Sequence, residues 1–344
     1  MHAGSFQFVS RFAALVATVA TVFILGGCTP KVLVNVGDGT DSALREQVVY
    51  RDRGSSHNRI AQIDVRGLIV DGRSSGLLGS GPNPVDIFIQ RLDLAASDSR
   101  VKAVILRINS PGGTVAASES MLRELDRFKA KTGKPVIVSM GEVAASGGYY
   151  LALGGDTIIA QETSVTGSIG VIFPTINVSE GLAHIGVVSR AVKSGPNKDL
   201  ANPLEPMRES QYGVVQEIVD DFYGRFVTLV RTRRAGLTDG NASIATDGRV
   251  VTGSRALELG LIDATGSVRD AFEEAKKRAR IGAATWVKYR NEDATPGSVY
   301  AKALATDPTS DLIAKAAAYV GVVPSGFYYL WQPGVGSGVN AYTE

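Results

Sequence analysis

Three stretches rich in serine and glycine each follow a short apolar run. The stretches are Asn109–Gly113, Glu142–Tyr150 and Thr166–Gly170, and the apolar runs before them are 101–109, 135–140 and 157–160. Continuous apolar runs of this length are typical of parallel strands, whose carboxyl ends meet at one edge of an open sheet. Paired glycines there leave backbone N–H groups free to approach a substrate, and a serine hydroxyl beside a base can act as a nucleophile. The sequence therefore predicts a reactive serine at this edge.

The base that would activate this serine is harder to find. Histidine is the usual base, but the three histidines lie at the N-terminus, in a polar stretch and in a predicted helix (His2, His57 and His184). The Gly-x-Ser-x-Gly motif of α/β-hydrolases does not occur, and we ascribe the Ser-x-x-Lys sequence 99–102 to chance because a strand is predicted to begin at Val101. Lysine remains, and the turn 193–199 carries two lysines between an apolar strand and Gly and Pro residues. Spacing alone does not distinguish this turn from a solvated loop.

Composition excludes several classes of protein. The 344 residues are 44% hydrophobic, with 36 basic against 34 acidic side chains, so the chain is neither disordered nor basic enough to predict nucleic-acid binding. A single cysteine excludes an internal disulfide framework and a Cys-rich metal site, and three histidines disfavour a His-based one. We therefore expect no metal and no cofactor.

The N-terminus has the features of an export signal. Residues 12–25 are apolar or small, follow Arg11, and are too few for a comfortable transmembrane helix. Leu25-Gly26-Gly27-Cys28 resembles a bacterial lipobox, in which the cysteine is lipidated and becomes the mature N-terminus. We expect a signal peptide over 1–27 and lipidation at Cys28; the alternative is an uncleaved signal anchor. Both place the rest of the chain outside the cytoplasm, at a membrane of the bacterial cell envelope.

The rest of the chain divides into three parts. Residues 28–58 are polar and aperiodic and predict a tether with one short strand at most. Residues 59–290 alternate between strand and helix patterns, which predicts an α/β fold with parallel strands and right-handed crossovers. A helix is expected to open at Asn83-Pro84, another to end at Gly133, a long one to cover 207–235, and a strand to cover 187–193. We assign no role to the extension 291–344.

Four motifs in order resemble the bacterial signal peptide peptidase A family, which includes protease IV. They are Asn109–Gly113, Ala144–Tyr150, Thr166–Gly170 and Lys193–Asp199, and the segments Asp247–Val250 and Gly260–Asp263 also fit. The resemblance covers roughly 59–280. It implies a crotonase/Clp-protease-like fold, with parallel sheet layers flanked by helices.

The resemblance also implies roles for individual residues. Ser146 would be the nucleophile of a serine endopeptidase and Lys198 its general base, with Lys193 as the alternative base. Ser168 would orient the lysine amine, and the N–H groups of Gly113 and Gly147 would form the oxyanion hole. The chain has one catalytic unit, and short family members imply a homo-oligomer in which neighbouring subunits contribute Ser and Lys to each site.

The expected function is a membrane-tethered serine endopeptidase that degrades cleaved signal peptides and other extended apolar peptides through an acyl-enzyme. This chain departs from the family in its anchor. Family members are commonly held by a transmembrane segment, whereas the N-terminus of this chain resembles that of a lipoprotein. Two alternatives remain open at this point. One is a non-catalytic envelope lipoprotein on the same scaffold, and the other is a crotonase-type acyl-CoA enzyme, which export disfavours because CoA is cytoplasmic.

Overall fold

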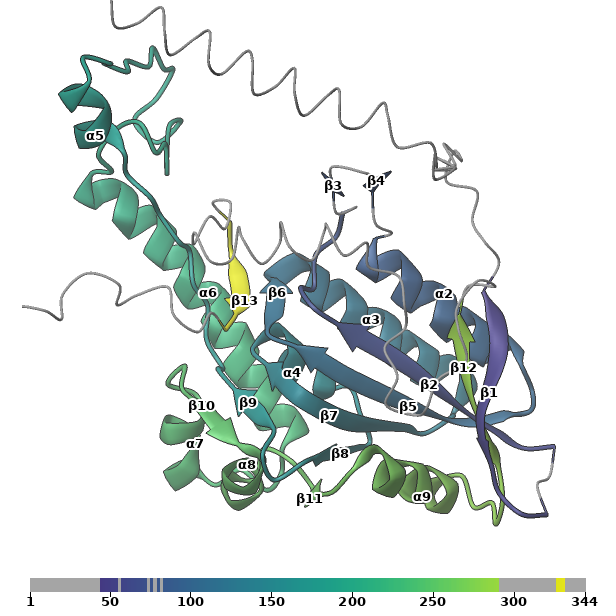
Figure 1. Ribbon diagram of the computed structural model, residues 1–344. Helices are drawn as coiled ribbons and strands as arrows, with labels where there is room; N and C mark the ends of the chain where they lie inside the picture. The colour runs from purple at the N-terminus through teal and green to yellow at the C-terminus, as the bar shows by residue number, and fades with distance from the viewer. Residues whose placement is uncertain are drawn as a thin grey trace, which may run out of the picture. The chain divides into compact units, whose positions relative to one another are not determined.

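The centre of the molecule is a twisted, mainly parallel sheet (Figure 1). The computed structural model describes residues 44–54, 57–72, 75–76, 79–80, 83–290 and 326–331. Among them the sheet runs in the order β1 (Arg45–Arg51), β12 (Thr285–Arg290), β2 (Arg59–Arg66), β5 (Val101–Ser110), β7 (Val136–Ala145), β8 (Thr157–Ala160) and β11 (Ala264–Thr265). Every neighbouring pair from β12 to β11 is parallel, and β1 is antiparallel to β12. The predicted α/β class with a parallel sheet is confirmed.

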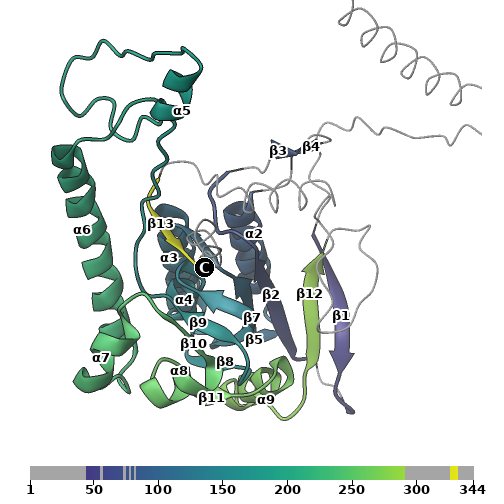
Figure 2. The ribbon, with the colours of Figure 1, turned by 60° about the vertical axis from the view of Figure 1, so that its left-hand side comes forward.

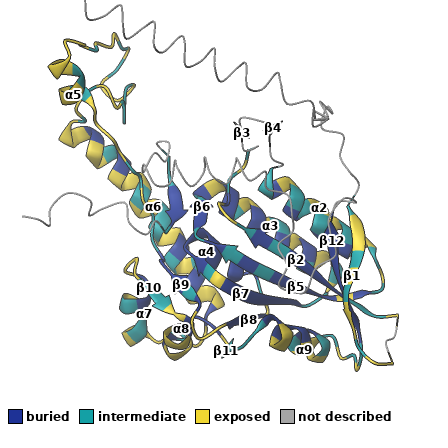
Figure 3. Ribbon diagram, in the orientation of Figure 1, coloured by how far each residue is buried: buried dark blue, intermediate teal, exposed yellow. Residues whose placement is uncertain are grey.

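Helices cover both faces of this sheet, because successive strand residues point to opposite sides. Val104, Leu106 and Ile108 of β5 belong to a large apolar cluster with the helices α2 (Pro84–Ser97) and α3 (Val115–Thr132). The intervening Ala103 and Ile105 belong to a smaller cluster under α9 (Val268–Arg278). The central strands β5 and β7 are therefore mostly dark blue, the colour of buried residues, in Figure 3, whereas the edge strand β1 is mostly exposed.

The predicted ends of the first two helices follow from their capping residues. Asn83 accepts a hydrogen bond from the Val85 N–H, and Pro84 stands at the first helical position, where its missing N–H costs nothing. Gly133 ends α3 in the left-handed conformation, with φ 64°, which glycine adopts without strain.

The second half of the chain surrounds the edge where the parallel strands end. A long loop with the short helix α5 (Ser179–His184) leads into α6 (Glu209–Arg233), followed by α7 (Asp239–Ala245) and α8 (Gly253–Leu259). Both Figure 1 and Figure 2 draw α5 beside the end of α6 that is farther from the sheet. We call residues 171–208 the arm. No described helix is both long and apolar enough to cross a membrane.

The strand predicted over 187–193 is wrong. These residues form no strand, and Val187, Val188 and Val192 are exposed. Alternating apolar residues form a strand only where a neighbouring strand pairs with them, and within the described part of the chain none does.

Several short strands lie at the carboxyl edge of the sheet. β9 (Val165–Gly167) pairs in parallel with the last residues of β7, and β10 (Val250–Thr252) pairs with β9. β6 (Gly112–Thr114) pairs antiparallel with β13 (Tyr328–Leu330). β13 belongs to the C-terminal extension, to which we assigned no role from the sequence. A further pair, β3 (Ser75–Gly76) and β4 (Gly79–Ser80), lies outside this group. The predicted tether contributes β1 to the sheet.

Candidate active site

Ser146 sits in a strained turn directly after β7. Its φ is 51° and its ψ is −114°, a combination that costs a non-glycine residue free energy and is found mainly at functional sites. The backbone is fixed on both sides, because the Ser146 N–H donates to the Gly167 oxygen at 2.8 Å and its oxygen accepts from Tyr150 at 2.8 Å. The side chain is buried, and it does not cap the short helix α4 (Gly147–Ala152) that follows. The surroundings thus hold the backbone in a costly geometry without using the hydroxyl as a cap.

Strand register places Ser168 beside Ser146. Ala145 of β7 pairs with Gly167 of β9 in parallel, so the next residue of each strand is a serine. Ser168 is also buried and also has a positive φ, 50°. The structure therefore brings together two of the predicted site residues.

The predicted oxyanion donors also meet at this edge. A Cβ placed on Gly147 would come within 3.1 Å of the Gly113 nitrogen, and one placed on Gly112 would come within 2.7 Å of the Gly147 nitrogen. A Cβ on Gly113 would lie only 1.8 Å from the Ile69 oxygen. Glycine is required at these positions because no side chain fits between the backbones, and the close approach gathers N–H groups beside Ser146.

The two lysines of the fourth motif lie in the arm and differ in their surroundings. Lys193 forms ion pairs with Asp199 and, at 3.9 Å, with Glu205. Lys198 is exposed in the turn that follows Pro196. Among the described residues, no hydrogen bond or ion pair joins either lysine to Ser146. One chain alone therefore does not bring the predicted base to the predicted nucleophile.

The segment Asp247–Val250 supports the Ser168 turn. The Arg249 oxygen accepts the Ser168 N–H at 2.7 Å, and Val250 pairs with Gly167. The guanidinium of Arg249 bonds the Asp247 carboxylate, which lowers the pKa of Asp247. This ion pair closes the loop that holds Ser168 in place.

The segment Gly260–Asp263 has a structural role. The Asp263 carboxylate accepts from the Ile158 N–H at 2.7 Å and from both terminal nitrogens of Arg234, at 3.0 and 3.1 Å. It thereby ties β8 to the residue that follows α6. No contact of Asp263 within the described ranges reaches Ser146.

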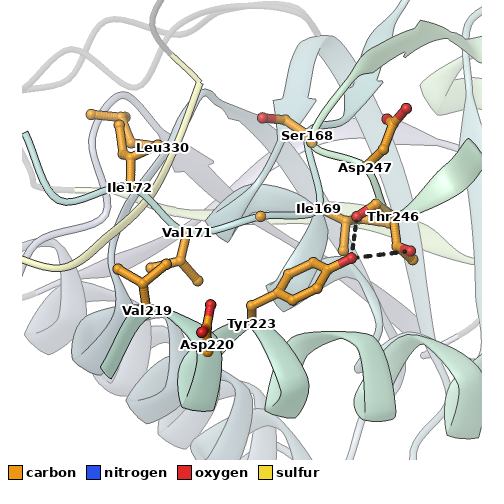
Figure 4. Close-up of a pocket in the computed structure, with 12 residues that line it drawn as sticks. Ser168, Ile169, Val171, Ile172, Val219, Asp220, Tyr223, Thr246, Asp247 and Leu330 are labelled. Carbon is orange, nitrogen blue, oxygen red and sulfur yellow. Dashed lines mark hydrogen bonds between the residues drawn. The ribbon is translucent and has the colours of Figure 1, made fainter. Parts of the chain in front are cut away.

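A cleft of about 390 Å³ opens beside Ser168 (Figure 4). Its wall combines the Ser168 turn, α6 and β13, and includes Ile172, Val219 and Leu330. Tyr223 crosses it and donates to the Thr246 oxygen at 2.7 Å. The lining is mixed, because apolar side chains share it with the carboxylates of Asp220 and Asp247.

Aromatic residues lie near the site, and we predicted no role for them from the sequence. The Tyr329 ring lies 5.0 Å from that of Tyr150 and 4.7 Å from that of Phe226, centroid to centroid, and its hydroxyl donates to the Phe222 oxygen at 3.1 Å. Burial raises the pKa of the Tyr329 phenol, which therefore stays neutral. Residues 327–331 are rich in aromatic side chains, but the aromatic residues Tyr150, Phe222 and Phe226 beside Tyr329 lie more than 100 residues away in the sequence.

A lysine with a strongly lowered pKa occurs outside the site. Burial lowers the pKa of Lys288 to about 8, although Asp64 lies 3.3 Å from its amine. Its strand β12 is three strands from β7, about 14 Å across the sheet, so Lys288 does not serve Ser146. Among the described residues, no group of three or more His, Cys, Asp or Glu side chains could hold a metal ion.

A strained, buried serine beside converging backbone N–H groups is the arrangement expected in a serine-type hydrolase. Comparison with known proteins agrees: residues 128–282 match the model of peptidase family S49. The "Putative signal peptide peptidase SppA" of Enterococcus faecium is 36% identical over 241 residues, which cover 70% of each chain. Protease 4 of Salmonella typhi is 40% identical over 64% of this chain and 35% of its own. The chloroplastic serine protease SPPA of Arabidopsis thaliana is 35% identical over 56% and 28%.

The chain belongs to peptidase family S49. It is a serine-type endopeptidase, which decides against the two alternatives left open by the sequence, a non-catalytic scaffold and an acyl-CoA enzyme.

Proposed function

We propose that this chain is a membrane-tethered endopeptidase that cleaves extended apolar peptides, including released signal peptides, with Ser146 as nucleophile and Lys198 as general base. The observation that carries the proposal is the turn at Ser146, where a buried serine with φ 51° adjoins the Gly113 and Gly147 nitrogens. Ser168, next to Ser146 by register, would orient the lysine amine.

The proposed reaction proceeds in two halves. The neutral Lys198 amine takes the proton of the Ser146 hydroxyl as its oxygen attacks the substrate carbonyl carbon, and the Gly113 and Gly147 N–H groups bind the resulting oxyanion. Lys198 then gives the proton to the leaving amine, which leaves an acyl-enzyme. Water attacks the acyl carbon as Lys198 takes one of its protons. The bond between that carbon and the Ser146 oxygen then breaks, Lys198 returns the proton to the Ser146 oxygen, and the peptide acid is released.

We infer that Lys198 reaches the Ser146 of a neighbouring subunit. Within one chain Lys198 is exposed and has no described contact with Ser146. The arm that carries it also exposes apolar side chains, among them Ile185 at 73% and Val188 at 85% of full exposure. A second copy packed against the arm would bury them, and it would remove the water that keeps an amine protonated.

A reactive-serine label tests the nucleophile. A fluorophosphonate probe should label the wild-type chain and the Ser97→Ala control, whose serine is exposed at the end of α2. Ser146→Ala should lose the label and roughly 10⁴–10⁶-fold of peptide hydrolysis while keeping its circular dichroism spectrum. Labelling that persists in Ser146→Ala would reject Ser146.

The proposed tether rests on residues 1–27 and Cys28, which lie outside the described residues. A lipid on Cys28 would hold the enzyme at the membrane surface. Cys28→Ser should abolish incorporation of a palmitate analogue and leave a precursor larger by residues 1–27. Absence of label on the wild-type chain would make the segment an uncleaved anchor instead.

A further inference from the structure

The cleft beside Ser168 adjoins the proposed nucleophile. Ser168 lines the cleft and lies next to Ser146 by the register of β7 and β9. On the opposite side, α6 supplies Val219, Asp220 and Tyr223, which Figure 4 shows pointing from the helix toward the Ser168 turn. The volume of about 390 Å³ is enough for one long side chain. A peptide held for cleavage at Ser146 would therefore pass the cleft with one of its side chains.

The walls of the cleft suit the aliphatic stem of a long side chain. Ile172 and Val219 contribute aliphatic groups. The Tyr223 hydroxyl donates to the Thr246 oxygen at 2.7 Å, and this hydrogen bond holds the ring across the cleft. The face of an aromatic ring binds a cation as well as an apolar group. Lysine and arginine combine an apolar stem with a charged end, so their side chains match these walls.

The two carboxylates of the cleft differ in their partners. Asp247 is paired with the guanidinium of Arg249, which balances its charge. Asp220 accepts a hydrogen bond at 2.7 Å from the neutral amide of Gln216, and it forms no ion pair within the part of the chain that the structure describes. Asp220 therefore gives the cleft a net negative charge, which favours a positively charged occupant.

We propose that the cleft is a substrate subsite for a lysine or arginine side chain, and that Asp220 selects its positive charge. The stem of the bound side chain lies against Ile172, Val219 and the Tyr223 ring, and its ammonium or guanidinium group reaches the Asp220 carboxylate. This inference rests on the proposed function, because it takes Ser146 as the nucleophile beside which the peptide is held. Released signal peptides suit such a subsite, since they combine an apolar segment with basic residues.

A scan of matched peptides tests the subsite. A single lysine, norleucine or glutamate is placed at each position of an extended apolar peptide in turn, and kcat/KM is measured with the wild-type chain. Norleucine keeps the four-carbon stem of lysine and lacks the amine. At one position within two residues of the scissile bond, lysine should exceed norleucine about fivefold and glutamate should be poorest; the factor is modest because Asp220 is exposed to water. Equal values for lysine and norleucine at every position would reject the subsite.

Variants of α6 test whether Asp220 selects the charge. Asp220→Asn should lower the ratio of kcat/KM for the lysine peptide to that for the norleucine peptide about fivefold, and Asp220→Lys should reverse the preference in favour of glutamate. Asp221→Asn and Asp221→Lys are the matched controls, because Asp221 pairs with Arg225 and does not line the cleft. These controls change the net charge by the same amount and should leave the ratio unaltered. An unaltered ratio in Asp220→Asn, or an equal loss for all three peptides in Asp220→Lys, would overturn the proposal.

Binding without turnover separates this inference from the proposed function. Fluorescent lysine and norleucine peptides are titrated into the Ser146→Ala chain, with and without Asp220→Asn, and anisotropy is the readout. Tighter binding of the lysine peptide that Asp220→Asn abolishes, in a Ser146→Ala chain that still hydrolyses peptides, would support the subsite and reject Ser146 as nucleophile. Hydrolysis that requires Ser146, with equal binding and equal kcat/KM for the two peptides, would reject the subsite and leave the proposed function standing.

Discussion

Ser146 and Lys198 are fixed by different parts of the protein. The Ser146 turn is held within one chain by backbone hydrogen bonds from β9 and α4. Lys198 lies on an exposed turn, and Lys193 beside it is engaged by Asp199 and Glu205. Asp199 in turn accepts from Gln211 at the start of α6, so Lys193 serves to shape the turn that presents Lys198.

Alanine substitution should distinguish the two lysines. Lys198→Ala should lower kcat by roughly 10³-fold or more because it removes the base, while Lys193→Ala should lower it less than about tenfold because it loosens only the turn. Steady-state kinetics with circular dichroism as the folding control would measure both. The opposite ranking would assign the base to Lys193.

Lys288 should make stability depend on pH. Its pKa is lowered from 10.5 to about 8 by burial, and Arg290 and Arg107 add to the effect against the opposing Asp64. Between these two values the unfolded chain holds a proton that the folded chain has released, so the free energy of unfolding should rise with pH. Lys288→Met should flatten this rise by up to one proton in urea unfolding curves, whereas the exposed Lys131→Met should not. An identical slope in both variants would contradict the lowered pKa.

At the level of elements, the sequence predicted the helix ends and the buried strands, which depend on residues close together in the chain. Asn83-Pro84 and Gly133 marked helix ends, and the apolar runs marked β5, β7 and β8 correctly. The strand predicted over 187–193 was wrong because alternation of apolar and polar residues does not indicate whether a partner strand exists. The strands β6, β9 and β13 have three residues each and are defined by long-range pairing, which no local pattern encodes.

The part of the candidate site that depends on local motifs was also predictable from the sequence. The serine and glycine motifs predicted the edge of the sheet at which Ser146, Ser168 and the glycine pair gather. The cluster of aromatic rings was not predictable, because Tyr150, Phe226 and Tyr329 meet only through tertiary packing. Aromatic residues that are far apart in the sequence and touch only in the folded chain produce no periodic pattern in the sequence.

The tie between β8 and the end of α6 should matter for stability. Asp263→Asn removes the charge that pairs with the buried Arg234, so we expect a loss of about 1–3 kcal/mol in the free energy of unfolding. Asp239→Asn breaks a comparable contact with Arg231, but Asp239 is 95% exposed, so the loss should stay below about 0.5 kcal/mol. Equal losses in denaturant titrations would contradict a structural role for Asp263.

At the scale of the whole molecule, the proposed active site draws on two parts of the chain, the core and the arm. The core carries the proposed nucleophile and oxyanion donors, whereas the arm carries Lys198 and exposed apolar residues. A heterologous interface, repeated around a closed ring, would bring each arm to the next subunit's Ser146. Activity per subunit should then fall on dilution below the dissociation constant of the assembly.

Mixing two inactive variants tests the shared site most directly. Ser146→Ala and Lys198→Ala chains, carrying different affinity tags, are dissociated, mixed in equal amounts, reassembled and purified through both tags. If neighbours share each site, about a quarter of the sites combine an intact Ser146 with an intact Lys198, and hydrolysis should return to roughly that fraction of the wild-type rate. A mixture of Ser146→Ala with the double variant should remain inactive. Doubly tagged assemblies of the two single variants that show no activity would contradict a site shared between subunits.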